Sequence, residues 1–110
     1  MAREIKFRAW TGERMIQDVP SNTVDVKLMQ FTGMKDMNDQ DIYEGDLVRE
    51  THIVPEERFV TVCPIEFADG MFIINDENFG EQTPLHENVY GCEVVGNIYE
   101  NPELMAIPDE

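Results

Sequence analysis

Short runs in which apolar and polar side chains alternate recur along this chain, with turn-forming residues between them. In EIKFRAW, near the N-terminus, Ile5, Phe7 and Ala9 fall on one side of an extended backbone. Lys6 and Arg8 fall on the other side, which we expect to face water. A repeat of two residues is typical of a β-strand with one buried face, so the pattern predicts a protein built mainly of strands.

The same alternation, or a short apolar run bounded by turn residues, defines the expected strands. They are residues 4–10, 14–19, 23–31, 46–54, 57–67, 71–75 and 92–101. The first two are expected to form a hairpin across a glycine turn, and Asp69 with Gly70 predicts a tight turn between the fifth and sixth. Many short strands joined by Gly, Pro and Asn turns favour a small all-β barrel or sandwich.

Three shorter features carry local expectations. Residues 76–91 show no clear period and are either a long polar loop or a short helix that begins at Pro84, with Thr83 as its cap. Gly96 lies within the last strand and indicates a bend or a close approach of another stretch of backbone. Asn101 precedes a proline and is expected to cap one helical turn.

The stretch FTGMKDMNDQDIYEGDLVRE holds five carboxylates between Asp36 and Asp46. A calcium loop of the EF-hand type needs a glycine at position 6 and a glutamate at position 12, and no frame of this stretch supplies both. A looser carboxylate site for a divalent ion is the alternative. A reversing turn explains more residues, because Gly33 can adopt the positive φ that ends the preceding strand, and Glu44, Gly45 and Asp46 can form a second tight turn. We therefore expect a turn between two β elements, with most of its acids in water.

Three stretches of the chain resemble the YopX family of small phage and prophage proteins, encoded mainly by phages of Gram-positive bacteria. They are REIKFRAW (residues 3–10), MQFTGMKDMNDQDIYEGDLV (29–48) and EVVGNIYENPEL (93–104), and they occur in the family's order. The resemblance covers about 40 of the 110 residues. It does not extend to residues 52–91.

The resemblance implies a mainly β fold, a small SH3-like β-barrel preceded by an N-terminal β-hairpin arm or small subdomain. We accordingly expect this N-terminal hairpin subdomain at residues 1–36, and the barrel with a short C-terminal turn at residues 37–110. The family has no established biochemical activity, so no catalytic residue, cofactor or metal ligand is transferred to this chain.

Charge is the global anomaly of the composition, with a formal net charge of −15. Residues 1–30 hold five basic and four acidic side chains, a balance of +1, and the other 80 residues hold three basic and 19 acidic, a balance of −16. Such a surface repels phosphates, so we expect no direct binding of nucleic acid. The excess acid either serves solubility or forms a surface that competes with nucleic acid for a basic partner.

No apolar run approaches the roughly 18–20 residues that span a bilayer, and the N-terminus lacks the apolar core of a signal peptide. We therefore expect no membrane association and a location in the host cytoplasm. In that compartment Cys63 and Cys92 are expected to be reduced core side chains. His52 and His86 lie far apart and in no ligand-spaced cluster, which argues against a zinc site.

Two aromatic residues beside turns, Trp10 and Tyr43, are candidates for contact with a partner, with core packing as the alternative. A hairpin that cannot bury both faces alone also favours self-association, so a homo-oligomer with a host or phage protein partner is expected. The leading hypothesis is a non-enzymatic interaction module. The rivals are an acidic nucleic-acid mimic that blocks a host DNA-binding or defence protein, and an enzyme with a pocket around a histidine or cysteine.

Overall fold

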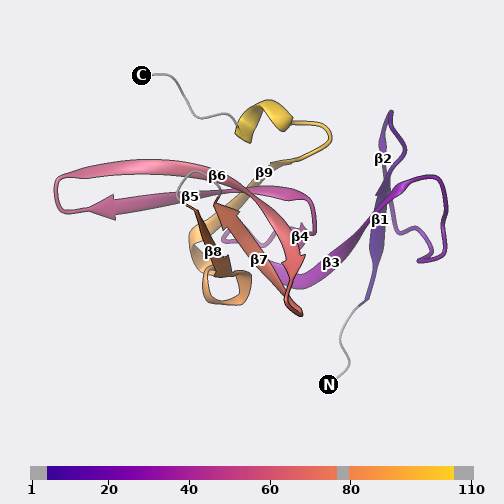
Figure 1. Cartoon of the computed structure of the whole chain (residues 1–110), viewed down its shortest axis with the longest axis horizontal. Coiled ribbons are helices and arrows are strands. Elements are labelled where there is room, and N and C mark those ends of the chain that lie inside the picture. Colours follow the sequence, from indigo (N-terminus) through magenta and orange to yellow (C-terminus); the bar gives the residue numbers. More distant parts are fainter. Residues whose placement is uncertain (1–4, 77–79, 106–110) are drawn as a thin grey trace.

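The computed structural model describes residues 5–76 and 80–105, and its strands form two antiparallel sheets (Figure 1). The strands in chain order are β1 (Phe7–Trp10), β2 (Met15–Gln17), β3 (Lys27–Lys35), β4 (Asp41–Tyr43), β5 (Asp46–Val54), β6 (Glu57–Ala68), β7 (Met71–Asp76), β8 (Glu81–Pro84) and β9 (Cys92–Asn97). Three short 3-10 helices are η1 (Leu85–Glu87), η2 (Val89–Gly91) and η3 (Pro102–Met105). The predicted mainly β class is confirmed. No helix within the described ranges has both the length and the apolar content to cross a membrane.

The first sheet has the strand order β2-β1-β3-β4. The predicted N-terminal hairpin is confirmed, with Trp10 opposite Met15 across its turn. It does not stand alone, because β1 also pairs with β3 along its length. The third strand begins at Lys27, later than predicted, and continues past Gly33 to Lys35. Gly33 has the expected positive φ of 86°, but the register of β3 against β4 shifts there, so this glycine forms a bulge and does not end the strand.

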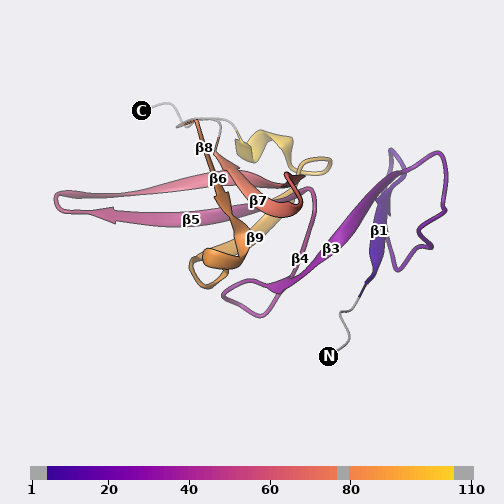
Figure 2. The same ribbon diagram turned by 60° about the horizontal axis from the view of Figure 1, so that its bottom comes forward.

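The second sheet has the order β8-β7-β6-β5-β9, and Figure 2 shows it beside the first sheet. Asp69 and Gly70 connect β6 to β7 with positive φ at both positions, which is the two-residue turn that fits the twist of a hairpin. The β8 strand was not predicted. In addition, η1 has Pro84 as its N-cap with no side-chain hydrogen bond, so the predicted capping role of Thr83 is wrong.

The hydrophobic core lies on the second sheet and is closed by the β3–β4 hairpin. Its buried members are Ile42, Val48, Cys63, Ile65, Ile74, Leu85, Val89 and Cys92. Met34 of β3 packs against this cluster, and Ile42 of β4 belongs to it. The backbone N–H of Met37 also donates to the carbonyl of Cys92. The first sheet is therefore anchored to the second through the acidic stretch between β3 and β5. The predicted domain boundary at residues 36 and 37 falls between β3 and β4 and stays a prediction.

The β5–β6 hairpin extends well beyond the strands on either side of it (Figure 1). The β9 strand pairs with β5 only from Asp46 to Glu50, and β7 pairs with β6 only from Ile65 to Ala68. Residues 51–54 and 57–60 therefore form a two-stranded ribbon, which we call the arm. Its outer part has only the pairing between its own two strands.

Candidate functional site

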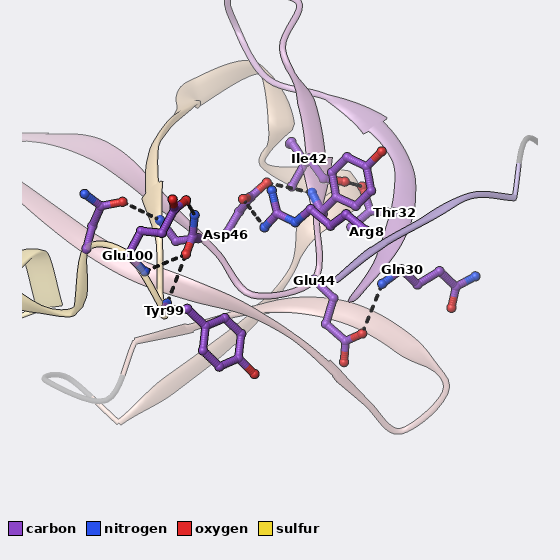
Figure 3. A network of polar contacts seen from close by, with 11 residues as sticks. Arg8, Gln30, Thr32, Ile42, Glu44, Asp46, Tyr99 and Glu100 are labelled. Carbon is purple, nitrogen blue, oxygen red and sulfur yellow. Dashed lines mark hydrogen bonds and ion pairs between the residues drawn. The ribbon is translucent and has the colours of Figure 1, made fainter. Parts of the chain in front are cut away.

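The three stretches that carry the family resemblance meet at one place, where the two sheets join. Arg8 comes from β1, Asp46 from the start of β5, and Asn97, which pairs with Asp46, from the end of β9. Figure 3 shows the polar contacts at this place. We call these residues, the carboxylates Asp36 and Asp41 and the polar partners of all of them the junction.

Arg8 and Asp46 form a buried ion pair at the centre of the junction. Nη2 of Arg8 donates to Oδ1 of Asp46 at 2.6 Å, and the backbone N–H of Tyr43 donates to the other carboxylate oxygen at 2.7 Å. Arg8 is 7% exposed and Asp46 is 2% exposed. Burial raises the pKa of Asp46, and the nearby Arg8 charge and the Tyr43 N–H oppose that rise.

Two expectations are therefore wrong at this position. Arg8 was expected to face water, yet its guanidinium lies against the ring of Tyr43, 4.6 Å from the ring centroid. Asp46 was expected to be a solvated turn residue. The physical reason is that each charge has its partner 38 residues away, so the ion pair offsets part of the cost of burying both charges, although the buried Nε of Arg8 has no hydrogen-bond partner among the described residues.

Asp36 is a second acid that the sequence placed in water and the fold buries. One oxygen accepts hydrogen bonds from the backbone N–H groups of Asn38 and Gln40, at 2.8 and 2.9 Å. The other accepts from the backbone N–H of Val94 in β9, at 2.7 Å. This carboxylate thus closes its own loop and ties it to the second sheet.

Asp41 lies between two lysines at the outer side of the junction. Its two oxygens accept from Lys6 at 2.8 Å and from Lys35 at 2.7 Å. The hydrogen bond from Lys35 is the largest cause of the lowered pKa of Asp41, followed by that from Lys6. A polar cavity of about 270 Å³ adjoins these groups and is also lined by Arg8 and Tyr43. The basic charges of Lys6, Arg8 and Lys35 are thus matched by acids of the same chain.

The aromatic candidates occupy different environments. Tyr43 is 6% exposed and packs against Phe31, with ring centroids 5.5 Å apart. Burial is the main cause of its raised pKa. Trp10 is half-buried and stacks on Tyr99, with centroids 5.9 Å apart and ring planes 12° apart. The structure does not bring Trp10 and Tyr43 into one surface, and the predicted contact role of each stays a prediction.

Trp10 and Tyr99 line an apolar groove of about 510 Å³ between the first sheet and the segment after β9. Its other walls come from the β1–β2 turn and from the residues that lead into β3. These lining residues are Thr11, Gly12, Asp25, Val26 and Lys27. We call this space the aromatic groove.

Tyr99 is held in place by a network around Asn97. The Asn97 side-chain oxygen accepts hydrogen bonds from the backbone N–H groups of Tyr99 and Glu100, at 3.0 and 2.9 Å (Figure 3). The Asn97 side-chain nitrogen donates to the Glu100 carboxylate at 2.8 Å. The segment before Tyr99 is fixed as well, because the N–H of Ile98 donates to the carbonyl of Gly45. These hydrogen bonds therefore fix the backbone that carries Tyr99, one of the two aromatic residues of the groove.

The cysteines and histidines do not converge. Cys63 and Cys92 are free and buried in the core, and burial is the main cause that raises the pKa of each thiol to about 11. His52 stacks on Phe59 and shares a 2.9 Å hydrogen bond with Thr61. His52 also lines a cavity of about 350 Å³ that contains neither cysteine nor His86.

The sequence did not single out Tyr99 or Asp25 as groove residues. Both lie near turns, but their approach to Trp10 depends on how the segment after β9 docks on the first sheet. The one local signal was Gly96, where a Cβ would lie 2.5 Å from the side-chain oxygen of Asn101. A neighbour does lie close to Gly96, but it is the side chain of Asn101, from the turn that carries Tyr99, and not the backbone segment that was predicted.

Comparisons with known proteins agree with this architecture. The family model described as "YopX protein" matches residues 13–106. The crystal structure of protein EF1440 from Enterococcus faecalis is similar, with a TM-score of 0.72 and 24% identity over 96% of this chain and 100% of that one. Protein yopX from Bacillus subtilis has a TM-score of 0.67 and 24% identity, with the same coverage. The search of curated proteins finds no match. At these identities the solved structures establish a shared fold.

Proposed function

This chain belongs to the YopX family, and from that premise we propose that it is a non-enzymatic phage or prophage accessory protein, a protein-interaction module that self-associates in the host cytoplasm. In this proposal the second sheet and the β3–β4 hairpin that closes its core act as an SH3-like barrel, preceded by the N-terminal hairpin. The family carries no established activity that would indicate a specific role.

The observation that carries the proposal is the arm. Ile53 is 77% exposed and Val60 is 50% exposed. Thr51 pairs with Val60, and Ile53 is two residues from Thr51, so both apolar side chains point to the same face of the ribbon. A two-stranded ribbon is marginally stable in water without further support. A second copy that covers this face would bury both side chains and stabilise the ribbon.

The bonding of several carboxylates and the raised pKa of the two thiols give less support to the rival hypotheses. A nucleic-acid mimic needs carboxylates clustered on one face, whereas Asp36, Asp41 and Asp46 bind groups of their own chain. Glu93 likewise pairs with Arg49. For an enzyme, a thiol with a pKa of about 11 holds little nucleophilic thiolate at neutral pH, and this applies to both Cys63 and Cys92.

Light scattering over a range of protein concentrations tests the self-association. We expect the purified protein to have a mass above the 12.7 kDa of one chain. The double substitution Ile53→Ser and Val60→Ser should weaken association by about tenfold or more, because it removes two apolar anchors. Val24→Ser is the matched control, since Val24 is 74% exposed but lies outside the arm.

Two results would contradict this proposal. One is a wild-type protein that keeps the mass of a single chain at the highest concentrations. The other is an equal loss of association in the Val24→Ser control, which would assign the effect to general surface hydrophobicity and not to the arm.

A further inference from the structure

We propose that the aromatic groove binds an arginine side chain presented by a basic segment of a protein partner. This inference rests on the proposed function as an interaction module and adds the chemistry that the module recognises. It concerns a surface other than the arm, so the two proposals can fail separately.

The stacked pair Trp10 and Tyr99 provides the binding platform. The ring planes are 12° apart while their centroids are 5.9 Å apart. Stacked rings that far apart are offset, so each ring leaves open a part of its face that the other does not cover. A planar guanidinium stacks on such a surface, and tryptophan is the strongest aromatic partner for a cation.

The two charges that line the groove, Asp25 and Lys27, oppose each other, and the net charge of the whole chain favours a cation. Asp25 lines the groove and is exposed, so its carboxylate is available to pair with a guanidinium beside the rings. Lys27 also lines the groove and opposes a cation locally. The whole chain carries −15, which attracts a basic segment and repels an acidic one. The cationic partner is therefore the one whose charge complements this molecule.

The groove has the size and rigidity that such a ligand needs. Its volume of about 510 Å³ is within the usual range of ligand pockets and exceeds the volume of one side chain, so it can also hold neighbouring peptide atoms. The hydrogen bonds of Asn97 fix the backbone at Tyr99 before any ligand arrives. A preformed platform lowers the entropy cost of binding.

Trp10 is the only tryptophan of the chain, so its fluorescence reports directly on the groove. We would titrate the protein of residues 1–110 with a short peptide of alternating arginine and glycine. Peptides with lysine or glutamate in place of arginine are the comparisons. We expect a saturable change in Trp10 emission with the arginine peptide, a several-fold weaker response with lysine, and none with glutamate.

Three variants test the assignment residue by residue. Tyr99→Ala removes half of the platform and should weaken arginine binding about tenfold. Asp25→Asn removes the counter-charge and should weaken it several-fold; asparagine tolerates the positive φ of 64° that Asp25 adopts. Lys27→Glu should strengthen binding several-fold. The last two changes lie on the surface, so they test the proposal even if Tyr99→Ala impairs folding.

The proposal is overturned if the arginine peptide produces no saturable change, or if the glutamate peptide binds as well. It is also overturned if arginine binding is the same in Asp25→Asn, Lys27→Glu and wild type, which would mean that the peptide associates with the acidic surface at large. Light scattering on the same variants separates the two proposals, because self-association through the arm should not respond to changes in the groove.

Discussion

The junction and the arm use β-strands of the same chain in opposite ways. At the junction, the buried Arg8 and Asp46 are joined by an ion pair, and Asp36 binds three backbone N–H groups. In the outer arm the two strands pair only with each other, and Ile53 is left exposed. The difference indicates that the fold is specified at the junction. The arm adds little to the stability of a single chain, so its surface is free to serve contacts with another molecule.

The largest expected effect comes from breaking the central ion pair. Asp46→Ala leaves the Arg8 charge buried without its partner and removes the acceptor of the Tyr43 N–H. We expect the free energy of unfolding to fall by about 3–5 kcal/mol. Urea unfolding followed by circular dichroism measures it. Since small domains have a total stability of about 5–15 kcal/mol, this variant should be close to unfolding.

The matched substitution in the arm is Ile53→Ala, which should change the stability of the monomer by less than about 0.5 kcal/mol.

The double variant Arg8→Met with Asp46→Ala should reduce the free energy of unfolding by less than the sum of the two single changes, because neither buried charge is then left alone. Equal losses for Asp46→Ala and Ile53→Ala at a concentration where the protein is monomeric would remove the distinction between junction and arm.

Sequence patterns predicted the elements whose determinants are local. The β6–β7 hairpin depends on Asp69 and Gly70, which adopt the turn by themselves, and Gly45 supplies the positive φ that starts β5. The burial of Asp36 and Asp46 was not predictable in this way. Their partners, Val94 and Arg8, lie 58 and 38 residues away, and an acid between two strands is otherwise most often in water.

The same reason explains which parts of the candidate site were missed. Trp10 stood out because it is aromatic and lies beside a turn, but Tyr99, which completes the platform, is 89 residues further along the chain. Alternation also failed around β1, where Ile5, two residues before the strand, is 63% exposed and Arg8 within the strand is buried. The strand lies against an acidic loop there, and a charged residue with a buried partner can take the inward position.

An intermediate effect is expected where the β9 turn meets the junction. In Gly96→Ala the new Cβ would lie 2.5 Å from the side-chain oxygen of Asn101, which now accepts the N–H of Asn97 at 3.2 Å. Displacing Asn101 should cost about 1–3 kcal/mol, measured by thermal and urea unfolding.

The control for this change is Gly91→Ala, because a Cβ at Gly91 meets nothing within 4 Å. It should leave the stability nearly unchanged. Placing Gly96→Ala in an Asn101→Ala background should reduce the cost without abolishing it, since the Cβ of residue 101 would still lie 2.9 Å away. An undiminished cost in that background would assign the effect to the remaining contact with the Cβ of residue 101 or to the conformational preference of Gly96, and not to displacement of the Asn101 amide group.

The smallest effect concerns the pH dependence of the junction through Asp41. Its pKa is lowered in the folded protein, so the folded state binds a proton less readily than the unfolded chain does. The stabilisation is therefore complete above the unfolded pKa of about 4 and is lost as the pH falls through the folded value. Because the Asp41 side chain is 24% exposed and water screens the pair, we expect it to contribute at most about 1 kcal/mol.

Urea unfolding at pH 7 and pH 3 measures this contribution. Asp41→Asn should show a smaller loss of stability between the two pH values than wild type does. Lys35→Met should reduce the loss in the same direction, because the Lys35 hydrogen bond is the largest cause of the shift. Molar salt should shrink the difference between wild type and Asp41→Asn. An unchanged pH dependence in both variants would mean that the junction stabilises the fold only through the buried pair Arg8 and Asp46. Lys6 and Lys35 would then, like the arm, lie outside the part of the molecule that specifies the fold.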